Sequence, residues 1–138
     1  MTDEPFKPRP RITSQGRRET DRANLRAELK RIDMRLHSQV IGTRRTDFID
    51  GSPSYDAASM AIVRLTTVLE RQENSFLHGV LTKTEQRSLV AVRNIVAHGG
   101  YSQMDDESFW ISATRDLPDL IRRLQQALPD TDAEPTFD

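Results

Sequence analysis

The side chains best suited to chemistry lie in one short segment, Arg93-Asn94-Ile95-Val96-Ala97-His98-Gly99-Gly100-Tyr101. At about 100° per residue, Asn94 and His98 share one helix face, so the amide could orient the imidazole. The negative end of the helix dipole favours a protonated imidazole at His98, and a guanidinium such as that of Arg93 binds phosphate well. Together these groups suit general acid–base chemistry at a phosphodiester, with Arg93 stabilising the negative charge.

Within a single helix, Arg93 and His98 point in directions about 140° apart and do not converge by themselves. Two copies of the helix facing each other in a dimer would bring a guanidinium and an imidazole together. The competing interpretation is structural, with Arg93 and Asn94 closing a loop through hydrogen bonds and His98 ending the helix. The other histidines, His37 and His78, are typical of a helix surface and a helix end rather than of catalysis.

Other kinds of active site are not indicated by the sequence. No histidine pair has the spacing of a metal site, and there is no glycine-rich phosphate loop, nucleophile elbow or dinucleotide-binding fingerprint. The chain has no cysteine, which excludes disulfides, thiolate metal ligands and a cysteine nucleophile. We therefore expect neither a metal nor a cofactor.

Apolar residues at helical spacing predict two long helices in the first half of the chain. A helix near residues 22–41 carries one apolar stripe, and Gly42 supplies its stop. A second helix follows Ser54 and is expected to continue to about residue 78. The predicted core positions are Leu25, Leu29, Ile32, Leu36 and Val40 in the first helix, and Ala58, Ala61, Ile62, Leu65, Val68, Leu69 and Phe76 in the second.

The second half of the chain predicts the helix that bears the motif and one helix more. A capping box, in which Thr82 and Glu85 satisfy each other's backbone donors, begins the third helix. Gly99-Gly100 ends it through a left-handed exit. A fourth helix begins after Asp105 or Asp106, and Pro118 is expected to kink it or to split it in two.

No alternating strand pattern of useful length occurs in the sequence. The sequence therefore predicts an all-α protein, an up-and-down bundle of four to five helices with short connections. A core of four helices in about 110 residues is small, so burial of one face in a dimer would supplement it.

Charge is distributed unevenly, although the net charge is only −1. Residues 1–50 carry 12 Lys/Arg against 8 Asp/Glu, whereas residues 101–138 carry 3 against 9. We expect a flexible basic arm over residues 1–20, one helical domain over residues 21–128 and an acidic disordered tail over residues 129–138. The near-neutral total excludes a strongly basic nucleic-acid binder but leaves room for a local basic cleft.

Four basic residues of the first helix could guide nucleic acid to such a cleft, although a solvated helix face is the simpler account. They are Arg22, Arg26, Lys30 and Arg31. The sequence has no run of about 18 apolar residues, and its first residues lack the apolar core of a signal peptide. We therefore expect a cytoplasmic protein without a membrane segment.

The motif and the residues that follow it resemble, in their order, the HEPN superfamily and in particular its HepT-like ribonuclease toxins. The matching features are Arg93-Asn94-x-x-x-His98, then Tyr101, Asp105 or Asp106, Trp110 and Leu117-Pro118-Asp119-Leu120. The run from Leu65 to Glu70 is similar to the family's second helix, which ends in a glutamate. The resemblance extends over residues 22–128.

The resemblance implies a bundle that dimerises through its motif-bearing helices, so that two copies of the motif line a shared cleft. It implies a metal-independent endoribonuclease, the toxin of a toxin–antitoxin pair, in which Arg93 and His98 are catalytic and Asn94 supports them. The implied partners are RNA, a second copy of the chain and a cognate nucleotidyltransferase antitoxin. That antitoxin would silence the toxin by AMPylation of Tyr101.

The sequence leaves alternatives open for Tyr101, for Trp110 and for the function. The family's usual spacing is His-x-Tyr, whereas Tyr101 lies one residue further from His98, after two glycines that make the loop supple. Tyr101 could instead be an aromatic lid near Trp110, and Trp110 suits a core position better than a base-stacking platform. The rival functions are a catalytically silent HEPN module that binds a partner protein or nucleotide, and a structural helical dimer.

Overall fold

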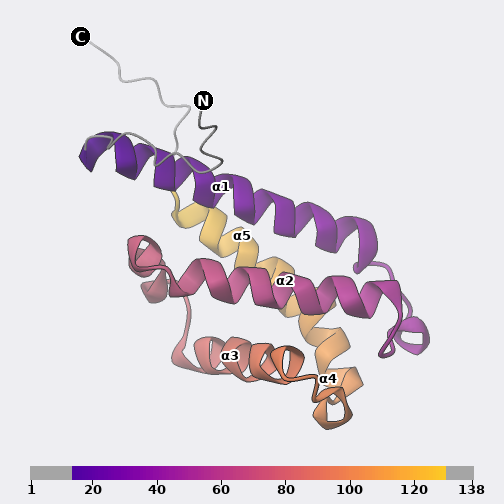
Figure 1. Ribbon diagram of the computed structural model, residues 1–138. Helices are drawn as coiled ribbons and strands as arrows, with labels where there is room; N and C mark the ends of the chain where they lie inside the picture. The colour runs from indigo at the N-terminus through magenta and orange to yellow at the C-terminus, as the bar shows by residue number, and fades with distance from the viewer. Residues whose placement is uncertain (1–13, 130–138) are drawn as a thin grey trace, which may run out of the picture.

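The computed structural model describes residues 14–129, which form five α-helices and no strand. The helices are α1 (Ser14–Gln39), α2 (Pro53–Glu70), α3 (Lys83–Ala97), α4 (Asp106–Ile111) and α5 (Leu117–Ala127). Three short 3₁₀ segments, Arg45–Asp47, Gln72–Gly79 and Tyr101–Gln103, connect the first four. Figure 1 shows α1, α2 and α3 lying one above another in alternating directions, with α5 crossing them obliquely. The predicted all-α bundle is confirmed.

The apolar stripe predicted for α1 is confirmed. Its five residues, Leu25, Leu29, Ile32, Leu36 and Val40, are each at most 3% exposed. On α2 the predicted positions from Ala58 to Leu69 are buried as well. These two faces account for most of the core, which the buried residues of α5 complete.

The start of α1 differs from the prediction. The helix begins at Ser14 instead of residue 22, so residues 14–20, which were assigned to the arm, are helical. This segment has few apolar residues and gives no periodic signal. Its arginines and glutamate are nevertheless good helix formers, and they extend a helix that the packed turns already stabilise. Residues 1–13 and 130–138, which contain the rest of the expected arm and tail, lie outside the described residues.

The end of α2 also differs from the prediction, because the α-helix stops at Glu70 and not near residue 78. The buried amide of Asn74 donates to the carbonyl oxygen of Val68 at 2.9 Å, and Nε2 of His78 is hydrogen-bonded to that of Leu69 at 2.7 Å. These side chains satisfy carbonyls at the end of the helix and so favour its termination. His78, predicted to close this helix, lies instead in the 3₁₀ segment after α2 and reaches back to its last turn.

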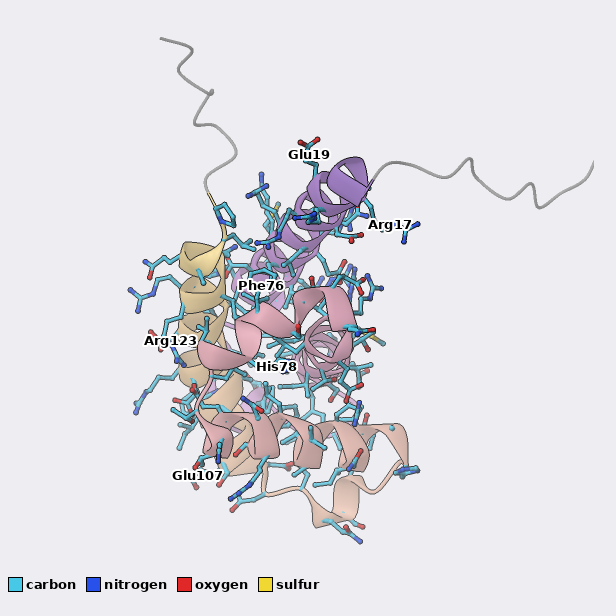
Figure 2. The ribbon with its side chains drawn as sticks, turned by 90° about the vertical axis from the view of Figure 1, so that its left-hand side faces the viewer. Arg17, Glu19, Phe76, His78, Glu107 and Arg123 are labelled. Carbon is cyan, nitrogen blue, oxygen red and sulfur yellow. The ribbon has the colours of Figure 1, made fainter. Side chains whose placement is uncertain are left out.

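Phe76, predicted as a core residue of the second helix, is 40% exposed. It lies on the 3₁₀ segment after α2, near His78 (Figure 2). The guanidinium carbon of Arg22 stands 3.8 Å from the centre of its ring. This cation–π contact joins the 3₁₀ segment to α1 and covers a ring that would otherwise face water.

The capping box at the start of α3 is confirmed. The backbone N–H of Thr82 donates to Glu85 Oε1 at 2.9 Å, and the N–H of Glu85 donates to Thr82 Oγ1 at 3.1 Å. Arg123 of α5 donates to both carboxylate oxygens of Glu85. The hydrogen bonds from Arg123 are the main reason why the pKa of Glu85 is lowered. Glu85 therefore both caps α3 and attaches it to α5.

The interruption predicted at Pro118 takes the form of a π-helical turn. Asp105 caps the start of α4, as expected, and residues Ser112–Asp116 form the π turn that leads into α5. Pro118 stands in the first turn of α5. A proline has no N–H for the carbonyl one turn earlier and its ring crowds that carbonyl, and a wider turn relieves both problems.

We expect Glu85→Gln to destabilise the fold by about 1 kcal/mol near neutral pH, because glutamine keeps the polar cap but loses the charge attraction to Arg123. The folded-state pKa of Glu85 lies below its usual 4.5. The contribution is therefore complete above pH 4.5 and is lost as the pH falls through the lowered folded-state value.

Urea unfolding at neutral and strongly acidic pH measures this effect, and the difference between wild type and variant should shrink in acid. Glu19→Gln, at an exposed glutamate of α1 (Figure 2) that lies beyond the first turn of its helix, is the control and should change neither value. An equal loss of stability from Glu85→Gln at both pH values would contradict the role given to its charge.

Candidate functional site

Two hydrogen bonds hold the guanidinium of Arg93 in place. Its Nη1 donates to Oε1 of Glu70 at 2.5 Å, and its Nε donates to Oδ1 of Asn94 at 3.3 Å. The Arg93 side chain is 25% exposed. Both N–H groups on Nη2 and one on Nη1 are left by these two contacts. Arg93 therefore has a fixed position and an open edge, which suits the oxygens of a phosphate.

Glu70 is the member of this group whose contact with Arg93 was not predicted from the sequence. It is the last residue of α2, and the antiparallel packing of α2 and α3 brings it beside Arg93, 23 positions further along the chain. In the sequence, Glu70 is distinguished only as a glutamate at the end of an apolar helical run. A local pattern does not specify a partner at that distance.

His98 stands apart from this group. It is the C-cap residue of α3, with an exposed side chain, and Gly99 at φ +65° then turns the chain away. Within residues 14–129, no hydrogen bond or ion pair joins the imidazole to Arg93 or Asn94. The expected orientation of the ring by the Asn94 amide is therefore absent, and the amide oxygen instead accepts from Arg93. The structure brings Arg93, Asn94 and Glu70 together and leaves His98 open to solvent.

Tyr101 is turned toward the body of the bundle. It begins the 3₁₀ segment after the two glycines, and its half-buried ring packs edge-on against Tyr55 of α2, with centroids 5.6 Å apart. Tyr55 contacts Phe48 and Phe109 and donates its hydroxyl to Asp106 at 2.9 Å. Burial and the Asp106 carboxylate raise the pKa of Tyr55. Tyr101 thus attaches the exit of α3 to an aromatic cluster.

Trp110 occupies a core position, as the sequence favours. Its ring is half-buried and packs against the hydrophobic core. Its indole Nε1 donates to the backbone carbonyl of Thr43 at 3.0 Å. A tryptophan held by both contacts fixes the turn after α1 and is not a free platform for stacking a base.

The outer surface of α3 is only partly covered by the rest of the described chain. Leu89 is its one buried residue, and Val90 is 39% exposed. Hollows of about 390 and 290 Å³ lie on either side of the helix, and both are lined by Leu89. The helix that carries Arg93 and His98 therefore presents apolar surface that a partner could cover.

Within the part of the chain that the structure describes, no three His, Asp or Glu side chains gather as metal ligands do. In the same part, no helix is long and apolar enough to cross a membrane. Comparison with known proteins found no match for this chain among protein families, curated proteins or solved structures. Inference about function therefore depends on the motif and on the site geometry.

We expect the contact between Glu70 and Arg93 to give a measurable coupling energy. In a double-mutant cycle of Glu70→Gln and Arg93→Gln, followed by urea unfolding, it should amount to about 0.5 kcal/mol, because the Arg93 side chain is only 25% exposed although that of Glu70 is 52% exposed. The exposed pair Arg44 and Asp47, 2.9 Å apart, provides a matched control cycle with a coupling close to zero. If the two cycles gave the same coupling, Glu70 would not be holding Arg93.

Proposed function

We propose that this chain is an endoribonuclease toxin of the HepT-like type, which cleaves RNA without a metal at a cleft shared by two subunits. A cognate nucleotidyltransferase antitoxin would neutralise it. The observation that carries this proposal is the guanidinium of Arg93, fixed by Glu70 and Asn94 with an open edge, on a helix that ends in the exposed imidazole of His98. The ordered resemblance to the HEPN family supports the same function.

The proposed reaction is an intramolecular transesterification. The RNA 2′-OH attacks the neighbouring phosphorus, the bond to the 5′-oxygen breaks, and the products are a 2′,3′-cyclic phosphate and a free 5′-OH. His98 of one subunit takes the proton from the 2′-OH, and His98 of the other gives a proton to the leaving oxygen. Arg93 stabilises the charge that develops on the phosphoryl oxygens.

Two subunits suit this chemistry better than one. Along one helix, Arg93 and His98 are separated by about 7.5 Å of axial rise and about 140° of rotation. A second α3 facing the first would supply an imidazole opposite each guanidinium. The same arrangement would cover Val90, which α3 leaves exposed.

One observation favours the rival function, a catalytically silent module that binds a partner protein or nucleotide. Glu70 neutralises Arg93 at 2.5 Å, and its carboxylate repels an incoming phosphate. The rival predicts that the chain causes no growth arrest. It also predicts that a neighbouring protein co-purifies with the chain whether or not Arg93 and His98 are intact.

Expression of the chain without its antitoxin should arrest growth and degrade RNA, and Arg93→Ala or His98→Ala should relieve both effects. Loss of a general acid–base group lowers such rates by about 10²–10⁴-fold, so cleavage by the purified variants should be nearly undetectable. His37→Ala, at an exposed histidine of α1, is the matched control and should cleave as wild type does.

The cleavage assays should be run in EDTA, because the proposed reaction uses no metal. Cleavage by His98→Ala at the wild-type rate would eliminate the proposed mechanism. Wild-type cleavage that disappears in EDTA and returns with Mg²⁺ would contradict the metal-independent reaction.

Co-expression with the cognate nucleotidyltransferase antitoxin should increase the intact mass of the chain by one or more AMP units. Tyr101→Phe should abolish this increase. Gly99 and Gly100 give the loop the freedom to release the Tyr101 ring from Tyr55 and expose its hydroxyl. Tyr55→Phe is the control, since its hydroxyl is buried and held by Asp106, and it should be modified like wild type. Modification mapped to any residue other than Tyr101 would refute the assignment.

A further inference from the structure

A polar groove, separate from the candidate site, lies between α1 and α2. Its volume is about 450 Å³, and its polar lining consists of Asn24, Glu28 and Arg31 from α1 and Arg64, Thr67 and Arg71 from α2. Three arginines and a single carboxylate therefore line the groove. The proposed mechanism uses none of these residues.

Glu28 orients two of the three guanidinium groups. Arg64 donates to it through Nε at 2.6 Å and through Nη2 at 2.9 Å, and Arg31 donates through Nη1 at 3.3 Å. The contact with Arg64 is the main reason why the pKa of Glu28 is lowered. The Glu28 side chain is only 19% exposed, so these contacts are partly shielded from water. The three groups together keep a net charge of +1.

Donors remain for a ligand after these contacts are made. Arg64 keeps the N–H groups of Nη1 and one on Nη2, and Arg31 keeps most of its own. Arg71 is exposed, and its guanidinium has no hydrogen bond or ion pair with any residue that the structure describes. With Arg71 the groove carries a net charge of +2, which favours an anionic ligand.

Along α2, the residues that line the groove extend to Arg71, at the C-terminal end of the helix. From Arg64 to Arg71 the groove follows α2 for about 10 Å, at about 1.5 Å per residue, which is enough for about two to three successive phosphates of a strand. Arg71 directly follows Glu70, the partner of Arg93. The C-terminal end of α2 therefore separates the groove from Arg93, and a strand that continued past this end would come to the candidate site.

We propose that the α1–α2 groove binds the sugar–phosphate backbone of single-stranded RNA on one side of the scissile phosphate. The inference rests on the proposed function for the identity of this ligand. Pre-oriented arginines suit phosphate oxygens, because a planar guanidinium can donate two parallel hydrogen bonds. Contacts of this kind give affinity and position without reading sequence.

Binding is measured with a fluorescent oligoribonucleotide whose 2′-hydroxyls are methylated, which removes the nucleophile and so prevents cleavage. Thr67→Glu places a carboxylate in the groove and should weaken binding about tenfold or more, because it repels the phosphates. Thr67→Gln adds a side chain of the same length without charge and should bind within about twofold of wild type. Both residues form helices better than threonine, so the fold should tolerate them.

The arginine contacts are tested through the salt dependence of binding. Arg71→Gln should lower the slope of log affinity against log salt by about 0.7, the value for one contact with a single-stranded phosphate. Arg122→Gln on α5 removes the same charge outside the groove and should leave the slope unchanged. Thermal melting of each variant verifies that it is folded.

If Arg71→Gln and Arg122→Gln weakened oligonucleotide binding equally, the proposed binding site in the groove would be overturned. The oligonucleotide would then be attracted by the overall charge of the protein. Full displacement of the oligonucleotide by equimolar AMP would also overturn the proposal, because the site would then take a single nucleotide. Suppose that the wild type never cleaves RNA, and that Thr67→Glu loses oligonucleotide binding while Thr67→Gln keeps it. The ribonuclease function then fails, and the proposal for the groove is upheld. If wild type cleaves RNA while the groove variants bind normally, the groove alone fails.

Discussion

The carboxylate of Glu85 fixes the start of α3 and attaches this helix to α5. Leu89 is the one residue of α3 that is buried, and Val92 packs against the core beside it, so apolar contact holds the middle of the helix but not its ends. Glu85 satisfies a backbone donor at the start of the helix and binds Arg123 of α5. Glu70 then holds the helix at Arg93, and the Tyr101 ring holds its exit against Tyr55. Polar contacts and one ring contact thus hold the two ends of a helix whose middle packs against the hydrophobic core.

This way of holding α3 determines what the helix can do. Because Val90 stays exposed, it remains for a partner surface, and the motif stands at the edge of the bundle. The contact of Arg93 with Glu70 then has two opposite effects. It fixes the guanidinium, which reduces the entropy lost on binding a phosphate, and it offsets the positive charge that would attract one. Since the Nη2 edge stays open, a phosphate can bind beside Glu70 without displacing it.

The features that sequence predicted correctly are local ones. The α1 stripe, the Thr82–Glu85 capping box and the left-handed exit at Gly99 each depend on residues within a few turns of one another. The end of α2 was missed because Asn74 and His78 reach back to carbonyls six and nine residues earlier. No propensity encodes such contacts. Glu70 beside Arg93 and Glu28 beside Arg64 are more distant still, and they exist only because antiparallel helices bring them together.

The contacts made by the basic residues of α1 differ from those of a single solvated helix face. The basic residues predicted as one face are dispersed, because Arg22 lies on the Phe76 ring and Arg26 donates to the carbonyl of Pro129. Only Arg31 joins a positive cluster, and it does so with residues of α2. Charge useful for binding a polyanion is therefore concentrated in the α1–α2 groove, in a chain whose net charge is −1. Because Glu70 and Arg71 are consecutive, the last turn of α2 joins this groove to the guanidinium of Arg93. A nucleic-acid strand would thus meet two local positive sites, the groove and the open edge of Arg93, with the carboxylate of Glu70 between them, rather than a uniformly basic surface.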